Sequence, residues 1–143
     1  MALSAADKLE IMEIAARACY ATDEFMPEQW AALFTDDAVV TVGDDLRLEG
    51  KEALLEHVRS KRAGNVRNRH LTSNPVIDGD GDSASMRVCV TVYDLAEGLG
   101  APCTLGEYLY DLIKVDDTWK VKRRNTLLLA GRSRVTRPRE TER

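Results

Sequence analysis

The sequence predicts one α+β domain, an open cone in which three N-terminal helices cover a curved antiparallel sheet around one apolar pocket. Apolar residues recur at helical spacing in the first part of the chain, and polar and apolar residues alternate from residue 66 onward. The 143 residues, 44% of them hydrophobic, have the size of a single domain. We expect this domain to span residues 1–131 and to be followed by a basic, disordered tail over residues 132–143.

Helical spacing and end signals place the three helices. The first is expected over residues 5–22, with Ser4 and Asp7 before and within its first turn in the arrangement of a capping box. Pro27 is well placed as the first residue of a short second helix. A third helix is expected over residues 51–61, where apolar positions again follow helical spacing. Each helix has an apolar face and should therefore lie on the sheet.

Strand signals begin before the third helix and continue after it. Residues 38–42 and 46–48 flank a Gly-Asp-Asp turn and predict a small hairpin. Four long strands are expected over residues 66–78, 83–95, 103–115 and 118–129. Because turn sequences join consecutive strands, these four should pair as antiparallel neighbours.

The strand over residues 83–95 predicts which side of the sheet faces the helices. Its apolar side carries Ala84, Met86, Val88, Val90 and Val92, and its mixed side carries Ser85, Arg87, Cys89, Thr91 and Tyr93. The apolar side should face the helices. The mixed side is too apolar to be comfortably solvated, so we expect a homodimer formed through it.

Composition argues against several classes of function. The formal net charge of −4 disfavours nucleic acid as the main partner. No window approaches the roughly 20 apolar residues that a membrane span needs, and the first residues lack a signal-peptide pattern, so a cytoplasmic protein without a membrane partner is expected. The basic residues from Lys120 onward are interpreted as a solvated strand face and a frayed terminus, with a functional anion-binding arm as the alternative. Three widely spaced cysteines, Cys19, Cys89 and Cys103, favour reduced thiols over disulfides or a metal site.

Only two histidines occur, which narrows the search for a general base. His57 is expected on an exposed helix turn, whereas His70 lies within a predicted strand. If that strand is regular, the residues on the side of His70 are Asn68, Thr72, Asn74 and Val76. Asp23, where the first helix ends, is a plausible carboxylate to orient the imidazole. The alternative is a structural histidine and a solvated aspartate, because spacing alone does not bring the two together.

Four features occur in a characteristic order along the chain. Asp23 precedes the segment Trp-Ala-Ala-Leu-Phe-Thr-Asp-Asp-Ala at residues 30–38, then come Arg-His-Leu-Thr-Ser-Asn at residues 69–74 and Trp119 in the last strand. This order resembles the SnoaL-like branch of the nuclear transport factor 2-like superfamily, over roughly residues 5–130. The resemblance implies a cone with a deep pocket and, commonly, a homodimer joined sheet to sheet.

The resemblance also implies a catalytic pair. In scytalone dehydratase, bile-acid dehydratase and lindane dehydrochlorinase, which this branch resembles, an aspartate ending the first helix supports a histidine on the first long strand. That histidine removes a proton beside a leaving group. The matching residues here are Asp23 and His70. The sequence departs from the two dehydratases at the next strand, where the apolar Val88 and Val92 stand at the positions matching their second histidine or aspartate.

We therefore expect a cofactor-independent dehydratase, isomerase or cyclase that acts on a hydrophobic oxygenated small molecule, with His70 as the general base and Asp23 as its orienting partner. The expected substrate-binding residues are Tyr20, Trp30, Asn74, Val88, Val92, Tyr108 and Asn125. No metal or other cofactor is expected. The alternative is a non-catalytic ligand-binding protein or small subunit, because the small subunits of ring-hydroxylating dioxygenases carry a similar Arg-His-Leu-x-Ser/Thr-Asn strand.

Overall fold

The computed structural model describes residues 1–131, and the predicted tail over residues 132–143 lies outside the described residues. In chain order the elements are α1 (Ala5–Asp23), α2 (Pro27–Ala32), β1 (Phe34–Val42), β2 (Leu46–Glu49), α3 (Gly50–Ala63), β3 (Asn68–Asp80), β4 (Ser83–Asp94), the 3₁₀ turn η1 (Leu95–Glu97), β5 (Thr104–Val115) and β6 (Thr118–Gly131). The predicted α+β class is confirmed. The predicted helices and strands occur with bounds shifted by a few residues at most.

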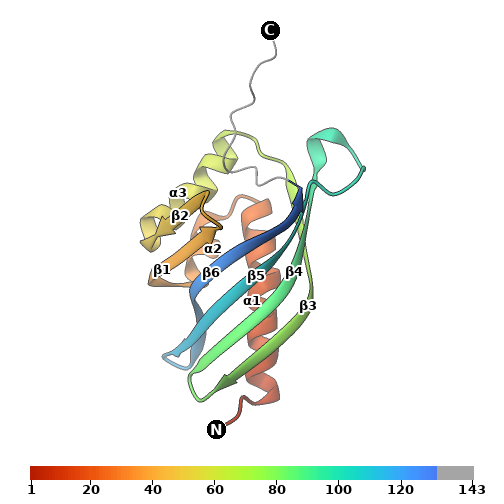
Figure 1. Ribbon diagram of the computed structural model, residues 1–143. Coiled ribbons are helices and arrows are strands. Elements are labelled where there is room, and N and C mark those ends of the chain that lie inside the picture. Colours follow the sequence, from red (N-terminus) through yellow and green to blue (C-terminus); the bar gives the residue numbers. More distant parts are fainter. Residues whose placement is uncertain (132–143) are drawn as a thin grey trace.

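One six-stranded sheet in the order β2-β1-β6-β5-β4-β3 forms the body of the fold (Figure 1). Neighbouring strands are antiparallel except for β1 and β6, which run parallel. The expectation of a wholly antiparallel sheet is therefore wrong at this one pairing. Turn sequences specify only hairpin partners, whereas β1 and β6 are separated by α3 and three other long strands. No local signal fixes the direction in which two such distant strands pair.

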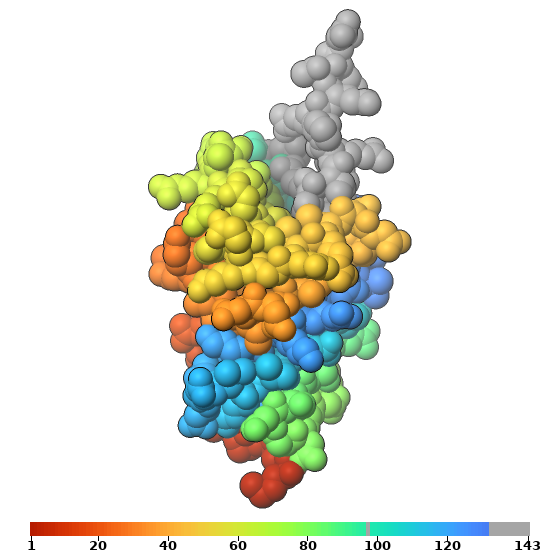
Figure 2. Space-filling view, turned by 90° about the vertical axis from the view of Figure 1, so that its left-hand side faces the viewer, coloured from red at the N-terminus to blue at the C-terminus, as the bar shows by residue number. Residues whose placement is uncertain are grey.

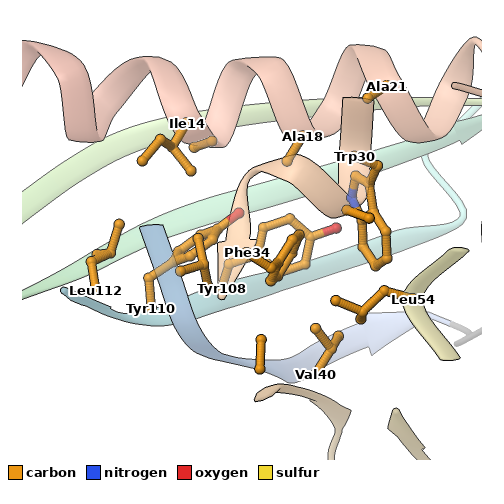
Figure 3. Close-up of a cluster of buried hydrophobic side chains, with 14 of the residues drawn as sticks. Ile14, Ala18, Ala21, Trp30, Phe34, Val40, Leu54, Tyr108, Tyr110 and Leu112 are labelled. Atoms are coloured by element: carbon orange, nitrogen blue, oxygen red, sulfur yellow. The ribbon is translucent and has the colours of Figure 1, made fainter. Parts of the chain in front are cut away.

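Helix α1 lies across one face of the sheet and supplies the main layer above the core (Figure 1). Ser4 and Asp7 form the predicted capping box at its start. Its buried side is made of small and aliphatic residues, which let the helix approach the strands closely. Ile14 and Ala18 point from this helix toward Tyr108 on β5 (Figure 3).

The short helix α2, helix α3 and the β1–β2 hairpin close one end of the core. In the space-filling view the yellow surface of α3 adjoins the orange surface of the hairpin (Figure 2). Trp30 of α2 is 1% exposed and packs on Phe34, with ring centroids 4.8 Å apart. Leu54 of α3 and Val40 of β1 complete this apolar cluster (Figure 3). Residues from three elements, α2, β1 and α3, thus pack together at this end of the sheet.

Strand β3 is irregular just beyond His70. Its pairing with β4 shifts register between Ser73 and Val76, and Asn74 adopts a positive φ of 56°. Pro75 has no N–H to donate to the ladder, which favours a bulge at this place. The bulge leaves Asn74 and Val76 exposed, so the expectation that they share one inner side with His70 is wrong.

Strand β6 contains a second irregularity, opposite a register shift between Asp111 and Leu112 of β5. Lys122 and Arg123 are both exposed, and alternation resumes with Arg124, which is buried at 8% exposure. The expectation of a solvated basic strand face is therefore wrong for Arg124. A bulge inserts one extra residue and thereby reverses which side the following side chains occupy.

Three observations bear on the environment of the protein. Cys19, Cys89 and Cys103 are free thiols. Within residues 1–131, no helix has the length and apolar character needed to cross a membrane. The same residues contain no group of three or more His, Cys, Asp or Glu side chains arranged to hold a metal ion.

Candidate active site

Asp23 and His70 form one hydrogen-bonded unit inside the fold. His70 Nδ1 lies 2.6 Å from Asp23 Oδ1, and the backbone N–H of His70 donates to Asp23 Oδ2 at 2.7 Å. The carboxylate is 2% exposed and the imidazole 11% exposed. The last residue of α1 thus lies against the start of β3, and both oxygens of one side chain are used to hold one histidine. The predicted pairing is confirmed although 47 positions separate the two residues.

This pairing determines where the imidazole carries its proton. The backbone N–H can only donate, so the Asp23 carboxylate accepts there, and its second oxygen accepts from Nδ1–H. We assign the proton to Nδ1 of His70 on this basis, which leaves the lone pair on Nε2. Burial lowers the pKa of His70 from its ordinary 6.5, although the hydrogen bond to Asp23 acts in the opposite direction. His70 is therefore neutral at pH 7, as a general base must be.

Lys61 of α3 contacts the end of α1 beside the pair. Its Nζ donates to the hydroxyl of Thr22 at 3.1 Å, immediately before Asp23 in the chain. Its positive charge contributes to lowering the pKa of His70. Sequence reasoning missed this residue, although a signal was present: Lys61 stands three positions after the buried Val58 and so shares the inner side of the helix.

Arg124 of β6 is the second cation beside the pair. Its guanidinium carbon lies 4.3 Å from the ring centroid of Tyr108 and 5.6 Å from that of Trp30. Its charge also contributes to lowering the pKa of His70. Burial raises the pKa of Tyr108 well above its ordinary range, so its hydroxyl remains protonated. Arg124 could not be identified from residue alternation because its inward direction depends on the bulge in β6.

Two further titratable groups line this interior. His57 was expected at the surface, but it is half-buried, and its ring centroid lies 5.7 Å from that of Trp30. Burial lowers the pKa of His57 to about 3, so it is neutral. Burial also raises the pKa of the Cys19 thiol to about 11, which makes a reactive thiolate at this position unfavourable.

The structure places the predicted substrate-binding residues in two different environments. Those inside the core are Trp30, Val88, Val92 and Tyr108. Tyr20 is instead 61% exposed on α1, and Asn74 is exposed in the bulge of β3. The amide of Asn125 accepts a hydrogen bond from the hydroxyl of Thr41 at 2.7 Å, on the other side of β6 from Arg124. These three residues therefore do not join the Asp23–His70 unit.

The residues that do meet can perform acid-base chemistry. A neutral imidazole is oriented by a buried carboxylate, two cations lie close enough to affect its pKa, and a protonated tyrosine stands on β5. The inner side of β4, where a second acid or base would stand, offers only Val88 and Val92 there. The site thus supplies one base in positively charged surroundings.

Comparison with solved structures gives close matches of the fold. A protein of unknown function with a cystatin-like fold from Nostoc punctiforme is 30% identical, with a TM-score of 0.80, over 90% of this chain and 95% of that one. A provisionally named scytalone dehydratase from Novosphingobium aromaticivorans is 23% identical, with a TM-score of 0.78, over 96% of each chain. The beta subunit of a provisionally named aromatic-ring-hydroxylating dioxygenase from the same species is 25% identical, with a TM-score of 0.74, over 87% of this chain and 90% of that one.

The family assignment comes from the sequence match. No curated protein sequence matches the chain. The family of SnoaL-like domains matches residues 4–125, which is most of the chain. Together with the cystatin-like architecture of the solved neighbours, this match shows that the protein belongs to the SnoaL-like domain family.

Proposed function

We propose that the protein is a cofactor-independent enzyme of lyase or isomerase type, in which His70 removes a proton from carbon in a hydrophobic, oxygenated small molecule. One observation carries the proposal: a carboxylate only 2% exposed uses both oxygens to hold the backbone and the ring of a single histidine. A buried charge is costly unless it is well bonded. Such a buried carboxylate can serve to orient a base, because it holds Nδ1 of the imidazole and leaves Nε2 available to take a proton.

The geometry supports a simple sequence of proton movements. His70 Nε2 takes the proton, the ring becomes an imidazolium, and the Asp23 carboxylate 2.6 Å from Nδ1 stabilises the new positive charge. The electron pair left on carbon can expel an adjacent hydroxyl, which is dehydration. It can also be reprotonated elsewhere, which is isomerisation, or attack an internal carbonyl, which is cyclisation. An oriented base of this kind typically contributes about 10²–10⁴-fold to the rate.

A proton donor for a leaving group must come from outside β4. Tyr108 offers a protonated phenol from β5, and its ring stacks against the guanidinium of Arg124. Burial raises the pKa of this phenol, and the positive charge of Arg124 opposes that effect by favouring the developing phenolate. Tyr108 is thus the proposed donor in place of the acid that Val88 and Val92 do not supply.

A non-catalytic role is the second candidate, and one comparison favours it. The solved structure with 25% identity is the beta subunit of a provisionally named aromatic-ring-hydroxylating dioxygenase, and so one subunit of a larger enzyme. If this chain were such a subunit or a ligand-binding protein, the Asp23–His70 unit would only fix the end of α1 to β3. The two candidates differ in whether Nε2 of His70 ever receives a proton from a ligand.

The outer side of the sheet supports a second proposal, that the protein is a homodimer. Exposed apolar residues there include Val76 at 59%, Leu109 at 38% and Leu127 at 45%. A groove of about 330 Å³ runs beside them, lined in part by Leu109 and the charged Arg87 and Asp111. A second copy of the sheet would cover this apolar surface. We also propose a cytoplasmic location, which the three free thiols support because a reducing compartment keeps cysteines unpaired.

An untargeted exchange experiment separates the candidates. Purified protein is incubated in D₂O with a small-molecule extract, and mass spectrometry detects compounds that are consumed or that gain deuterium at carbon. We expect the wild type to convert or label at least one compound and His70→Gln to do neither. The matched control is Asp44→Asn, which changes an exposed aspartate in a turn. A compound processed equally by the wild type and His70→Gln contradicts the proposal, and a compound bound but unchanged by the wild type supports the non-catalytic role.

A further inference from the structure

Arg124 is a buried cation that has no ion-pair partner within residues 1–131. Its side chain is 8% exposed, none of the salt bridges among the described residues includes it, and its Nε atom lacks a hydrogen-bond partner there. The rings of Tyr108 and Trp30 beside it offer cation–π attraction. That attraction is worth about 2 kcal/mol when desolvated, against several kcal/mol for removing a charge from water. The folded protein thus holds an imperfectly compensated positive charge in its interior.

Lys61 adds a second positive charge at the edge of the same interior. One of its three donors is used by the hydroxyl of Thr22, and the side chain remains partly exposed. The carboxylate of Asp23 acts on the charge of Lys61, but both of its oxygens are already bonded to His70. The site therefore contains one negative carboxylate, two positive side chains and a neutral histidine. Its net charge is positive.

We propose that Arg124 and Lys61 form a subsite for an anionic oxygen of the ligand, next to the base His70. The role of this subsite beside a catalytic base rests on the proposed function, whereas the binding of an anion by two cations does not. Two sources of the anion share this chemistry. The substrate can carry a carboxylate, or it can be a ketone or related carbonyl compound whose enolate oxygen becomes negative during the reaction.

In the enolate case, the reaction is a single proton transfer. The C–H bond next to the carbonyl breaks and its proton joins Nε2 of His70. The bond's electron pair forms a C=C bond, and the carbonyl π pair moves onto oxygen, where Arg124 and Lys61 meet it. Arg124 stabilises this charge without giving up a proton, because a guanidinium stays protonated in proteins. Lys61 is suited to reprotonate the oxygen, since burial lowers the pKa of its ammonium to about 8.

Two small probes distinguish the sources of the anion. 4-Nitrophenolate is a planar mimic of an enolate, and its absorbance reports how much of the bound probe is ionised. Benzoate is the carboxylate probe, followed by calorimetry. We expect the wild type to bind one of these anions, and the bound fraction of 4-nitrophenol to ionise at lower pH than in water if the enolate source is correct. Tighter binding of benzoate instead identifies a substrate that carries a carboxylate.

Variants test whether Arg124 and Lys61 are responsible. Arg124→Met should weaken binding of the preferred anion by about tenfold or more, because a charge-assisted bond is lost. Lys61→Met should weaken binding by about threefold, because this lysine is partly exposed and its charge is partly screened by solvent. Arg123→Met is the matched control, since its arginine is exposed on the other side of the same strand, and it should change nothing. Binding of neither anion by the wild type, or equal binding by both inner variants and the control, overturns the proposal.

Thermal unfolding gives a readout that does not depend on any ligand. If Arg124 is kept for binding, Arg124→Met should melt at the same temperature as the wild type or higher, because an imperfectly paired buried charge is removed. A large fall in melting temperature with unchanged anion binding would assign Arg124 a purely structural role. His70→Gln separates this proposal from the proposed function, because it should abolish turnover while anion binding persists. Turnover that survives in His70→Gln rejects the base and leaves the subsite standing.

Discussion

Replacing Asp23 by asparagine tests the local chemistry of the site without any knowledge of the substrate. Asparagine has nearly the same shape, but only one of its two terminal atoms can accept a hydrogen bond. In the wild type both oxygens accept, from the backbone N–H at 2.7 Å and from the ring at 2.6 Å. The backbone N–H cannot change its role, so it should keep the amide oxygen. The amide NH₂ then faces Nδ1 of His70 and forces that nitrogen to accept.

The expected consequence is a change of tautomer with a calculable cost. The proton of His70 should move from Nδ1 to Nε2, which removes the lone pair from the atom that would act as base. Asp23 raises the pKa of His70 through its hydrogen bond and charge, so the pKa should fall further in Asp23→Asn. The lost charge-assisted hydrogen bond is worth about 1.5–3 kcal/mol. On the substrate, the wrong tautomer should reduce turnover by about 10²–10⁴-fold.

Nitrogen NMR of the imidazole rings measures this directly. The chain has only two histidines, so His57→Gln assigns both sets of signals. The wild type should show a protonated Nδ1 and an unprotonated Nε2 for His70 at pH 7, and Asp23→Asn should show the reverse. The control Asp44→Asn changes an exposed aspartate in a turn and should leave the spectrum unaltered. A wild-type His70 protonated at Nε2, or signals unchanged in Asp23→Asn, would refute the orienting role of the carboxylate.

Two further predictions concern stability and assembly. Burial lowers the pKa of His57 and His70 below the ordinary 6.5, so the unfolded chain binds more protons than the folded one under acid conditions. Unfolding free energy should be fully present above pH 6.5 and fall below it by up to about 1.4 kcal/mol per pH unit for each histidine, as denaturant titrations at several pH values can measure. Stability that rises on acidification would show that the histidines are not buried in the neutral form. Light scattering should give the mass of a dimer, and Leu109→Glu on the outer sheet should shift it toward a monomer while Leu9→Glu on the exposed side of α1 should not. A wild-type monomer at micromolar concentration would remove the homodimer.

The fold was predictable from the sequence because its signals are local. The capping box at Ser4, the proline that starts α2 and the two-residue alternation of the long strands each depend on neighbouring residues. The parallel pairing of β1 with β6 depends on strands far apart in the chain, and no local pattern encodes it. The register shifts at Asn74 in β3 and at Lys122 in β6 were not predicted either, although Pro75 was a signal for the first.

The candidate site was predictable only in part for the same reason. Asp23 and His70 are 47 positions apart, and their pairing was expected from a family resemblance rather than from spacing. Arg124 stands among exposed basic residues and turns inward only because β6 contains an extra residue, so alternation placed it on the wrong side. Tyr20 follows the buried Cys19 directly, and one residue turns a helix by about 100°, which carries it to the solvent side of α1.

Asp23 and His70 are proposed to act together as one catalytic base. Once the exchange experiment has identified a substrate, the direct measurement is kcat/KM for His70→Ala, Asp23→Asn and the double variant under the same conditions. We predict that each single variant loses about 10²-fold or more and that the double variant loses little beyond the worse single, because the two residues act as a unit. Multiplicative losses in the double variant would contradict a single unit, and near-wild-type turnover in His70→Ala would contradict the base itself.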